Sequence, residues 1–405
     1  MCPSAVGPTA AAAPEDEGCV GAACEAAPVG DLRRPWRRGG PGSASPRPAR
    51  GPESAPETLW EVELGAAISA SAAFWEAPDG DLVALVGTHA GRFVGVPVDG
   101  ARAGAIALDV NVLGIIWSSA AVDDAGWAYF GADDDHLHAV DLAAGAHAWS
   151  LRLGDCTPAR APGPEGVRCD VDGGPTIGPG GDLFVGADGL YRVEPGAEGG
   201  TIRWHYPAST RKAKVVGRHV IAAPLVTLTG EAYYGGHDGA FTALQGDGTL
   251  RYQVTIGADV DAAPVMLSNG WVVFGADGGR VIAVDSAGAI RWSFVGGGDV
   301  RGALAVADDD TVVATTLDGL VHAIRGGDGS PRWSYAAGDA IGSSPVIDRE
   351  GSIYVGTRGD QVIAIDARGR RRWQIELPED VDGLALSDRG VLVVSCDDGV
   401  LRALR

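Results

Sequence analysis

Short runs of alternating hydrophobic and polar residues recur along most of the chain, and glycine or aspartate interrupts each run. Two such runs flank a Gly/Asp turn in VGTHAGRFVGV and again in FGADGGRVIAV, which is the pattern of a β-hairpin. The eight copies of this hairpin begin at Val86, Phe130, Val185, Tyr234, Phe274, Ala314, Val355 and Val394, roughly 40 to 55 residues apart. The pattern predicts an all-β chain made from one repeated unit.

Two further segments accompany each hairpin. A short strand led by small residues precedes it, as in IAAPLVT and GSSPVID, and a run with one aromatic residue follows it. These aromatic residues are Trp149, Trp204, Tyr252, Trp292, Trp333 and Trp373, and the first copy has Leu108 near that position. Four strands in a unit of this length describe a propeller blade, and blades bury their faces only by stacking into a ring.

The two ends of the repeat region complement each other. The last copy stops at Arg405 without an aromatic strand, whereas an orphan segment, LWEVELG with Trp60, precedes the first copy. We therefore expect residues 58–65 to complete the last blade. The fold prediction is an eight-bladed β-propeller over residues 58–405, made of four-stranded antiparallel blades and closed by the N-terminal strand.

A tighter motif lies between hairpin and tryptophan. In AVDSAGAIRW and AIDARGRRRW, Ala-x-Asp is followed by Gly and then Trp, which resembles the pyrroloquinoline-quinone (PQQ) enzyme repeat and lacks the Trp-Asp and Gly-His pairs of WD40 repeats. The resemblance implies that each tryptophan docks between neighbouring blades. The structural tryptophans would be Trp60, Trp149, Trp204, Trp292, Trp333 and Trp373.

The PQQ-like family divides by function. Its quinoprotein dehydrogenases bind PQQ and Ca²⁺ in the central funnel, and many carry adjacent cysteines over the cofactor; no Cys-Cys pair occurs here. The BamB-like branch is non-catalytic and belongs to the bacterial cell envelope. This chain is similar to that branch in its size and in the compactness of its repeats. We therefore expect a non-enzymatic scaffold that binds a protein partner and no cofactor. The alternative is a PQQ-dependent dehydrogenase that uses calcium.

The composition of the chain limits which kinds of partner and which cellular location we expect. Lys+Arg 32 against Asp+Glu 53 gives a net charge of −21, which argues against nucleic acid as the main partner. No apolar run is long enough to span a membrane. Residues 1–57 are rich in small residues, Pro, Gly and Arg, so we expect a disordered low-complexity tail. The tail has no visible signal peptide, and lipidation of Cys2 stays open, so the predicted envelope location rests on the resemblance.

The cysteines favour an oxidising compartment. Cys156 and Cys169 flank a Pro/Gly-rich loop, and we predict a disulfide between them. The redox states of Cys19 and Cys24 stay open. Cys396 alternates with hydrophobic residues and is interpreted as a core thiol.

No catalytic or metal site is predicted. GxSxG, HExxH and P-loop motifs are absent from the sequence. The acidic clusters at 133–135 and 308–310 fall at predicted hairpin turns, where aspartate is common, and the cluster at 169–174 is no stronger a candidate for a metal site. His136 and His138 share a strand face, and His322 occupies the same repeat position as His138 in a blade across the ring, so the histidines are not expected to share an ion.

Two connections between units are unusually long, and both precede a first strand, so we expect them on one face of the ring. One contains Cys156 and Cys169. The other is basic and contains Arg211, Lys212, Lys214, Arg218 and His219, including both lysines of the protein. We predict that this basic loop of a monomeric ring binds an acidic protein partner. An anionic headgroup, or no partner at all, is the alternative.

Overall fold

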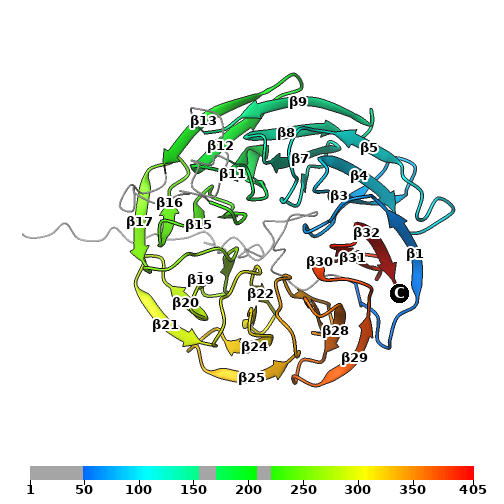
Figure 1. Ribbon diagram of the computed structural model, residues 1–405. Helices are drawn as coiled ribbons and strands as arrows, with labels where there is room; N and C mark the ends of the chain where they lie inside the picture. The colour runs from blue at the N-terminus through cyan, green and yellow to red at the C-terminus, as the bar shows by residue number, and fades with distance from the viewer. Residues whose placement is uncertain (1–48, 155–169, 208–219) are drawn as a thin grey trace, which may run out of the picture.

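The structure is a computed structural model that describes residues 49–154, 170–207 and 220–405. Eight four-stranded antiparallel sheets stand around a central axis as the blades of a ring (Figure 1). The predicted eight-bladed all-β propeller is therefore confirmed. Within the described ranges the only helical element is the 3-10 turn η1 (Pro179–Gly181), and no helix there is long and apolar enough to cross a membrane.

The first four blades follow one another in chain order. Blade 1 consists of β2 (Ala73–Glu76), β3 (Leu82–Gly87), β4 (Arg92–Pro97) and β5 (Leu108–Asn111). Blade 2 consists of β6 (Ala121–Val122), β7 (Trp127–Ala132), β8 (His136–Asp141) and β9 (Ala146–Arg152). Blade 3 consists of β10 (Thr176–Ile177), β11 (Leu183–Gly186), β12 (Gly189–Pro195) and β13 (Gly200–Pro207). Blade 4 consists of β14 (Leu225–Val226), β15 (Ala232–Gly235), β16 (Ala240–Leu244) and β17 (Leu250–Thr255).

The remaining blades complete the ring. Blade 5 consists of β18 (Val265–Met266), β19 (Val272–Ala276), β20 (Arg280–Val284) and β21 (Ile290–Val295). Blade 6 consists of β22 (Ala305–Val306), β23 (Thr311–Thr315), β24 (Leu320–Arg325) and β25 (Pro331–Ala336). Blade 7 consists of β26 (Val346–Ile347), β27 (Ile353–Gly356), β28 (Gln361–Ile365) and β29 (Arg371–Glu376). Blade 8 consists of β30 (Val381–Leu386), β31 (Leu392–Cys396), β32 (Val400–Leu404) and β1 (Thr58–Glu63).

Blade 8 is assembled from two distant parts of the chain. β1 pairs antiparallel with β32, so that Trp60 lies opposite Ala403 and Val62 opposite Leu401. Glu57 and Arg405 exchange two backbone hydrogen bonds, of 2.9 and 3.0 Å, just beyond this pairing. The N-terminal strand therefore closes the ring, as the sequence predicted.

Six tryptophans join each of their blades to the next one around the ring. Each indole Nε1 donates a hydrogen bond to a carbonyl oxygen in the segment that leads into the fourth strand of the following blade. The pairs are Trp60–Val98 (2.9 Å), Trp149–Gly196 (2.7 Å), Trp204–Gly246 (3.2 Å), Trp292–Gly326 (2.7 Å), Trp333–Ala367 (3.0 Å) and Trp373–Pro52 (2.8 Å). Tyr252 and Leu108 take this position in blades 4 and 1.

The glycine of the repeat motif packs against the tryptophan of the preceding blade. Gly329 and Gly369 have φ angles of +73° and +80°, which glycine adopts without strain. A Cβ atom would lie 2.8 Å from the Trp292 ring at Gly329 and 2.6 Å from the Trp333 ring at Gly369. The motif therefore pairs a tryptophan with a glycine one blade further on.

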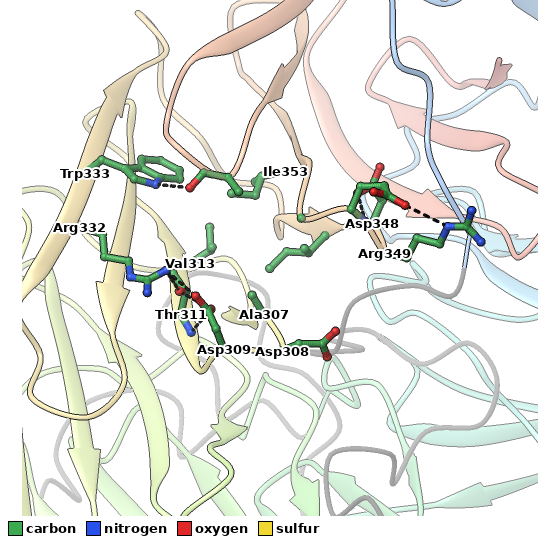
Figure 2. Close-up of a pocket in the computed structure, with 14 residues that line it drawn as sticks. Ala307, Asp308, Asp309, Thr311, Val313, Arg332, Trp333, Asp348, Arg349 and Ile353 are labelled. Atoms are coloured by element: carbon green, nitrogen blue, oxygen red, sulfur yellow. Dashed lines mark hydrogen bonds and ion pairs between the residues drawn. The ribbon is translucent and has the colours of Figure 1, made fainter.

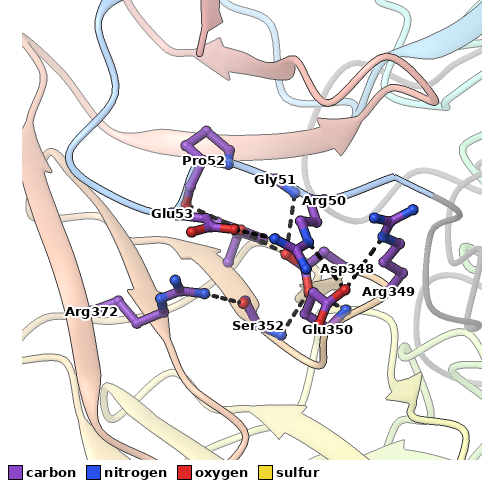
Figure 3. Close-up of polar contacts among 10 residues, drawn as sticks. Arg50, Gly51, Pro52, Glu53, Asp348, Arg349, Glu350, Ser352 and Arg372 are labelled. Atoms are coloured by element: carbon purple, nitrogen blue, oxygen red, sulfur yellow. Dashed lines mark hydrogen bonds and ion pairs between the residues drawn. The ribbon is translucent and has the colours of Figure 1, made fainter.

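Residues 49–57 pack against blades 7 and 8, although the sequence analysis assigned them to the tail (Figure 3). The Gly51 amide donates to Asp348 Oδ2 (3.1 Å), and Gly51 and Pro52 are buried. The Pro52 carbonyl accepts from Trp373, the role that the loop before the fourth strand plays elsewhere. The packed part of the chain therefore begins before Thr58. In the other blades a loop connects the third and fourth strands, whereas in blade 8 residues 49–57, which lead into β1, take the place of that loop.

Candidate functional site

The inner ends of all eight blades meet around a central funnel with a cavity of about 210 Å³. Most of the residues that line it are serine, alanine or glycine, including Ser118, Ala222, Ala263, Gly302 and Ser344. They come from the short segments that lead into the first strands, because only small side chains fit where eight blades converge. Trp117, Arg301 and three aspartates supply the larger and charged groups.

Charges on one side of the funnel neutralise one another. The Asp261 carboxylate is buried, and it lies 3.0 Å from His237 Nε2 and 3.3 Å from an Arg301 nitrogen. Arg301 also lies 2.9 Å from Asp277. The hydrogen bond to Asp261 raises the pKa of His237, whereas burial raises the pKa of Asp277. Arg301 is therefore already paired with acidic side chains of the protein itself.

A second polar group lies across the funnel. Burial, with the neighbouring Asp397 carboxylate, raises the pKa of Asp382 to about 6. Ser69 hydrogen-bonds to this carboxyl group and also lies 2.9 Å, through Oγ, from His89 Nε2. Burial lowers the pKa of His89, and its ring centre lies 4.1 Å from that of Trp117.

The Ser69–His89 pair was missed by the sequence analysis, since no motif links the two residues. In a hydrolytic triad the carboxylate orients the histidine, and the histidine accepts the serine proton. Here the carboxyl group contacts the serine instead, and among the described residues no carboxylate hydrogen-bonds to the His89 ring. The arrangement does not match a nucleophilic triad.

Two of the acidic clusters singled out in the sequence, at 133–135 and 169–174, meet between blades 2 and 3. Carboxylate oxygens of Asp133, Asp170 and Asp172 lie within 4.8 Å of one another. Oxygen ligands of this kind suit a hard divalent cation, but Ca²⁺ takes six to eight of them, so these three carboxylates would make only part of a site.

The three histidines singled out in the sequence lie in two separate blades. His138 is buried, with its Nδ1 3.1 Å from His147 Nε2 and its Nε2 3.1 Å from Asp134. His136 lies beside it on β8. His322, on β24, places its Nδ1 2.8 Å from Ser334 Oγ.

Other predicted site residues fall outside the described ranges. These are the basic residues Arg211, Lys212, Lys214, Arg218 and His219 and the predicted disulfide partners Cys156 and Cys169. Cys396 is a buried free cysteine, and burial raises the pKa of its thiol to about 12, as suits a core thiol.

The described funnel residues do not suit PQQ, which carries three carboxylates. Asp172, Asp261 and Asp382 line the cavity, and Arg301 is the one basic residue among the described lining residues. Since Arg301 already pairs with Asp261 and Asp277, the cavity presents net negative charge to an anionic ligand.

Known proteins share this architecture. The family described as "Outer membrane protein assembly factor BamB" matches residues 237–345 and 317–405. The solved structure of BamB from Moraxella catarrhalis is 18% identical, with a TM-score of 0.67, and the match covers 86% of this chain and 99% of that chain. A comparison with curated protein sequences finds no match.

Two further solved structures share the fold. The computationally designed Ika8 protein is 16% identical with a TM-score of 0.63, and the match covers 84% of this chain and 98% of that chain. The WD40 β-propeller domain of Doa1 is 15% identical with a TM-score of 0.56, and the match covers 86% of this chain and 97% of that chain. These likenesses show the fold alone. The repeat motif and the family match over residues 237–405 support the assignment of this propeller to the PQQ-like, BamB-like β-propellers.

Proposed function

We propose that this protein is a non-enzymatic scaffold of the bacterial cell envelope, which binds a protein partner at the mouth of its funnel. The match to the BamB family supports a role in protein interaction and an envelope location. The observation that carries the proposal is the exposure of two apolar side chains, Leu113 and Trp117, in the connection between β5 and β6.

The connection between β5 and β6 presents Leu113, which is 80% exposed, and Trp117, which is 43% exposed. Trp117 lines the funnel together with Asp172 and Ile221, which follow the two unusually long connections. Trp117, Asp172 and Ile221 each lie between a fourth strand and the next first strand, so these three residues share one face of the ring. We call this face the funnel-mouth face. Exposed aromatic and aliphatic side chains on an acidic surface are typical anchors for a protein partner.

The catalytic alternative has less support. The acidic groups of the funnel engage its arginine, and the contact between Asp382 and Ser69 does not arrange a nucleophile. Titration with PQQ and Ca²⁺ tests the alternative directly. Stoichiometric binding together with dye-linked alcohol oxidation would overturn the proposal.

Photo-crosslinking in cells tests the binding face. A photoreactive amino acid at Trp117 is expected to give a discrete crosslink to an envelope protein. The matched control places the same residue at Ile290, which is 54% exposed on the outer strand β21. Absence of a crosslink at Trp117, or the same products at both positions, would contradict the proposed face.

A further inference from the structure

A second cavity, of about 230 Å³, opens between blades 6 and 7 (Figure 2). We call it the inter-blade pocket. Its apolar lining includes Ala307, Val313, Trp333 and Ile353. The turns between first and second strands frame it, so it lies on the face opposite the funnel-mouth face. It is a separate site, and the proposed function does not depend on it.

The pocket leaves uncovered one of the tryptophans that join adjacent blades. Trp333 is only partly buried, whereas its counterparts in blades 5 and 7, Trp292 and Trp373, are 7% and 5% exposed. Because the indole N–H of Trp333 already donates to Ala367, the pocket offers the tryptophan ring and not a hydrogen-bond donor. An occupant is therefore held mainly by apolar contact.

The pocket is open because one side chain of blade 6 is small. Ala307 directly follows β22 as Leu267 directly follows β18 in blade 5, so the two residues occupy equivalent positions. Leu267 is buried and belongs to the same apolar cluster as Trp292. In blade 7, Pro52 of the N-terminal segment contacts Trp373. Among the described residues, blade 6 has neither kind of cover.

The described part of the chain begins at the rim of this pocket. The Arg349 amide donates to the carbonyl oxygen of Ala49 at 3.3 Å, and Arg50 Nε donates to Glu350 Oε1 at 3.1 Å (Figure 3). Arg349 and Glu350 both line the inter-blade pocket. Residues 1–48 therefore connect to the propeller directly beside the pocket.

One aromatic residue occurs in the sequence that precedes Ala49. It is Trp36, in RRPWRR, where two arginines stand on each side of a Pro-Trp pair. Residues 1–48 contain five arginines, no lysine and five acidic residues, so residues 49–405 carry the whole net charge of −21. The arginines around Trp36 are therefore attracted to the acidic body of the propeller.

The pocket suits an indole in size and in polarity. An apolar cavity of about 150 Å³ accommodates benzene, and the inter-blade pocket is larger. The Trp333 ring offers an aromatic contact. At the rim, Asp309 and Glu350 are 54% and 46% exposed and pair with Arg332 and Arg349. A carboxylate has about four acceptor positions, so each still has room to accept from an indole N–H or a guanidinium.

The connection to Ala49 makes a weak contact sufficient. The residues between Trp36 and Ala49, 37–48, are mostly Gly, Ser and Pro. A flexible linker of this length spans roughly 20 Å. Short flexible linkers give a tethered group an effective concentration in the millimolar range. An indole that binds the pocket with only millimolar affinity therefore occupies it when it belongs to the same chain.

We propose that Trp36 occupies the inter-blade pocket of its own chain and packs on the Trp333 ring, with the flanking arginines at the carboxylates of the rim. The N-terminal segment thereby covers two successive grooves between blades, with main-chain atoms at Trp373 and with a side chain at Trp333. The docked segment lies on the face away from the funnel mouth and leaves that face free.

A photoreactive amino acid in place of Trp36 tests the proposal in the purified full chain. We expect an intramolecular crosslink to residues 307–313 or 347–353, with a yield that does not change on dilution. Ala307→Leu, which copies the leucine of blade 5, is expected to lower this yield at least fivefold, and Ala307→Met is the second variant. Leu113→Ser on the opposite face is the matched control, with the yield unchanged. Thermal unfolding midpoints verify that the variants fold.

A labelled peptide of residues 31–40, DLRRPWRRGG, separates a tethered occupant from a free one. In fluorescence anisotropy we expect the peptide to bind the full chain with Trp36→Ala at least tenfold more tightly than the wild-type chain, because the tethered Trp36 competes for the pocket in the wild type. The same peptide with alanine at the position of Trp36 is the control and is expected to show no saturable binding.

Several results would overturn the proposal. These are equal peptide affinity for the two chains, a position-36 crosslink that maps elsewhere, and one that persists in Ala307→Leu. A crosslink that joins two chains would assign the pocket to a second copy. A photoreactive residue at position 332 that links to a different protein in cells, and not to residues 1–48, would assign it to a partner. The Trp117 crosslink is expected to persist in Ala307→Leu, so the two proposals fail separately.

Discussion

The indole Nε1 of Trp373 donates a hydrogen bond to the carbonyl oxygen of Pro52, 2.8 Å away, although the two residues are 321 positions apart in the sequence. The contact repeats, at the point of ring closure, the indole–carbonyl bond that Trp292 and Trp333 make with Gly326 and Ala367. The N-terminal segment therefore contributes the seventh blade's docking partner as well as strand β1.

Substitution of Trp373 tests the strength of this contact. We expect Trp373→Ala to lower the free energy of unfolding by roughly 3–5 kcal/mol, because a buried aromatic side chain is lost. Trp373→Phe keeps most of the apolar contact and loses the hydrogen bond, so a loss of about 1 kcal/mol is expected. Urea denaturation measures both. Tyr252→Phe is the control, since the Tyr252 hydroxyl has no hydrogen-bond partner among the described residues. Equal losses for Trp373→Ala and Trp373→Phe would contradict the packing argument.

Gly369→Ala and Gly257→Ala separate steric overlap from backbone strain. Both glycines have φ near +80°, but nothing lies within 4 Å of a Cβ at Gly257, whereas a Cβ at Gly369 would meet the Trp333 ring at 2.6 Å. Both substitutions strain the backbone by about 1–2 kcal/mol. We expect Gly369→Ala to destabilise by about 1–3 kcal/mol more, because it also displaces the indole. Thermal and urea unfolding compare the two variants, and equal stabilities would refute the proposed pairing of glycine and tryptophan.

The raised pKa of Asp382 predicts a pH-dependent effect of Asp382→Asn. Because the folded-state pKa, about 6, exceeds the unfolded value, this group stabilises the protein at low pH, and that stabilisation is lost as the pH rises from about 4 through 6. Asparagine resembles the protonated acid, so the variant should match the wild type near pH 4 and exceed its stability at pH 8 by on the order of 1–2 kcal/mol. Urea unfolding at the two pH values measures the difference. The exposed Asp388→Asn is the control, and a pH-independent difference for Asp382→Asn would speak against the assignment.

Charge reversal tests the basic loop. Replacement of Arg211, Lys212, Lys214 and Arg218 by glutamate is expected to abolish the crosslink at Trp117, because an acidic partner would be repelled. The unfolding midpoint should stay unchanged. Arg368 and Arg371, exposed residues near the opposite face, serve as the charge-reversal control. If the crosslink persists in the loop variant, the loop does not bind the partner.

The blade architecture was predictable because main-chain pairing leaves a local signature. Alternating residues around Gly/Asp turns mark each hairpin, and the orphan Trp60 segment identified the strand that completes blade 8. The role of Gly329 was not apparent from the motif, since its partner, Trp292, belongs to the preceding blade.

Features that depend on contacts between blades could not be predicted in the same way. The segment around Gly51 and Pro52 reads as low-complexity tail because its contacts use main-chain atoms, which leave no side-chain pattern. Ser69 and His89 meet only once the ring geometry fixes their connections.

The pairing of β1 with β32 also sets the order in which the protein can be made. Seven blades consist of contiguous residues and can form as the nascent chain leaves the ribosome, whereas β1 has to wait for residues 400–404, which are synthesised after those seven blades. A polypeptide that is released early therefore carries an unpaired edge strand, and such strands promote aggregation. Pairing of β1 with β32 therefore removes an edge that stays exposed until β32 has been made.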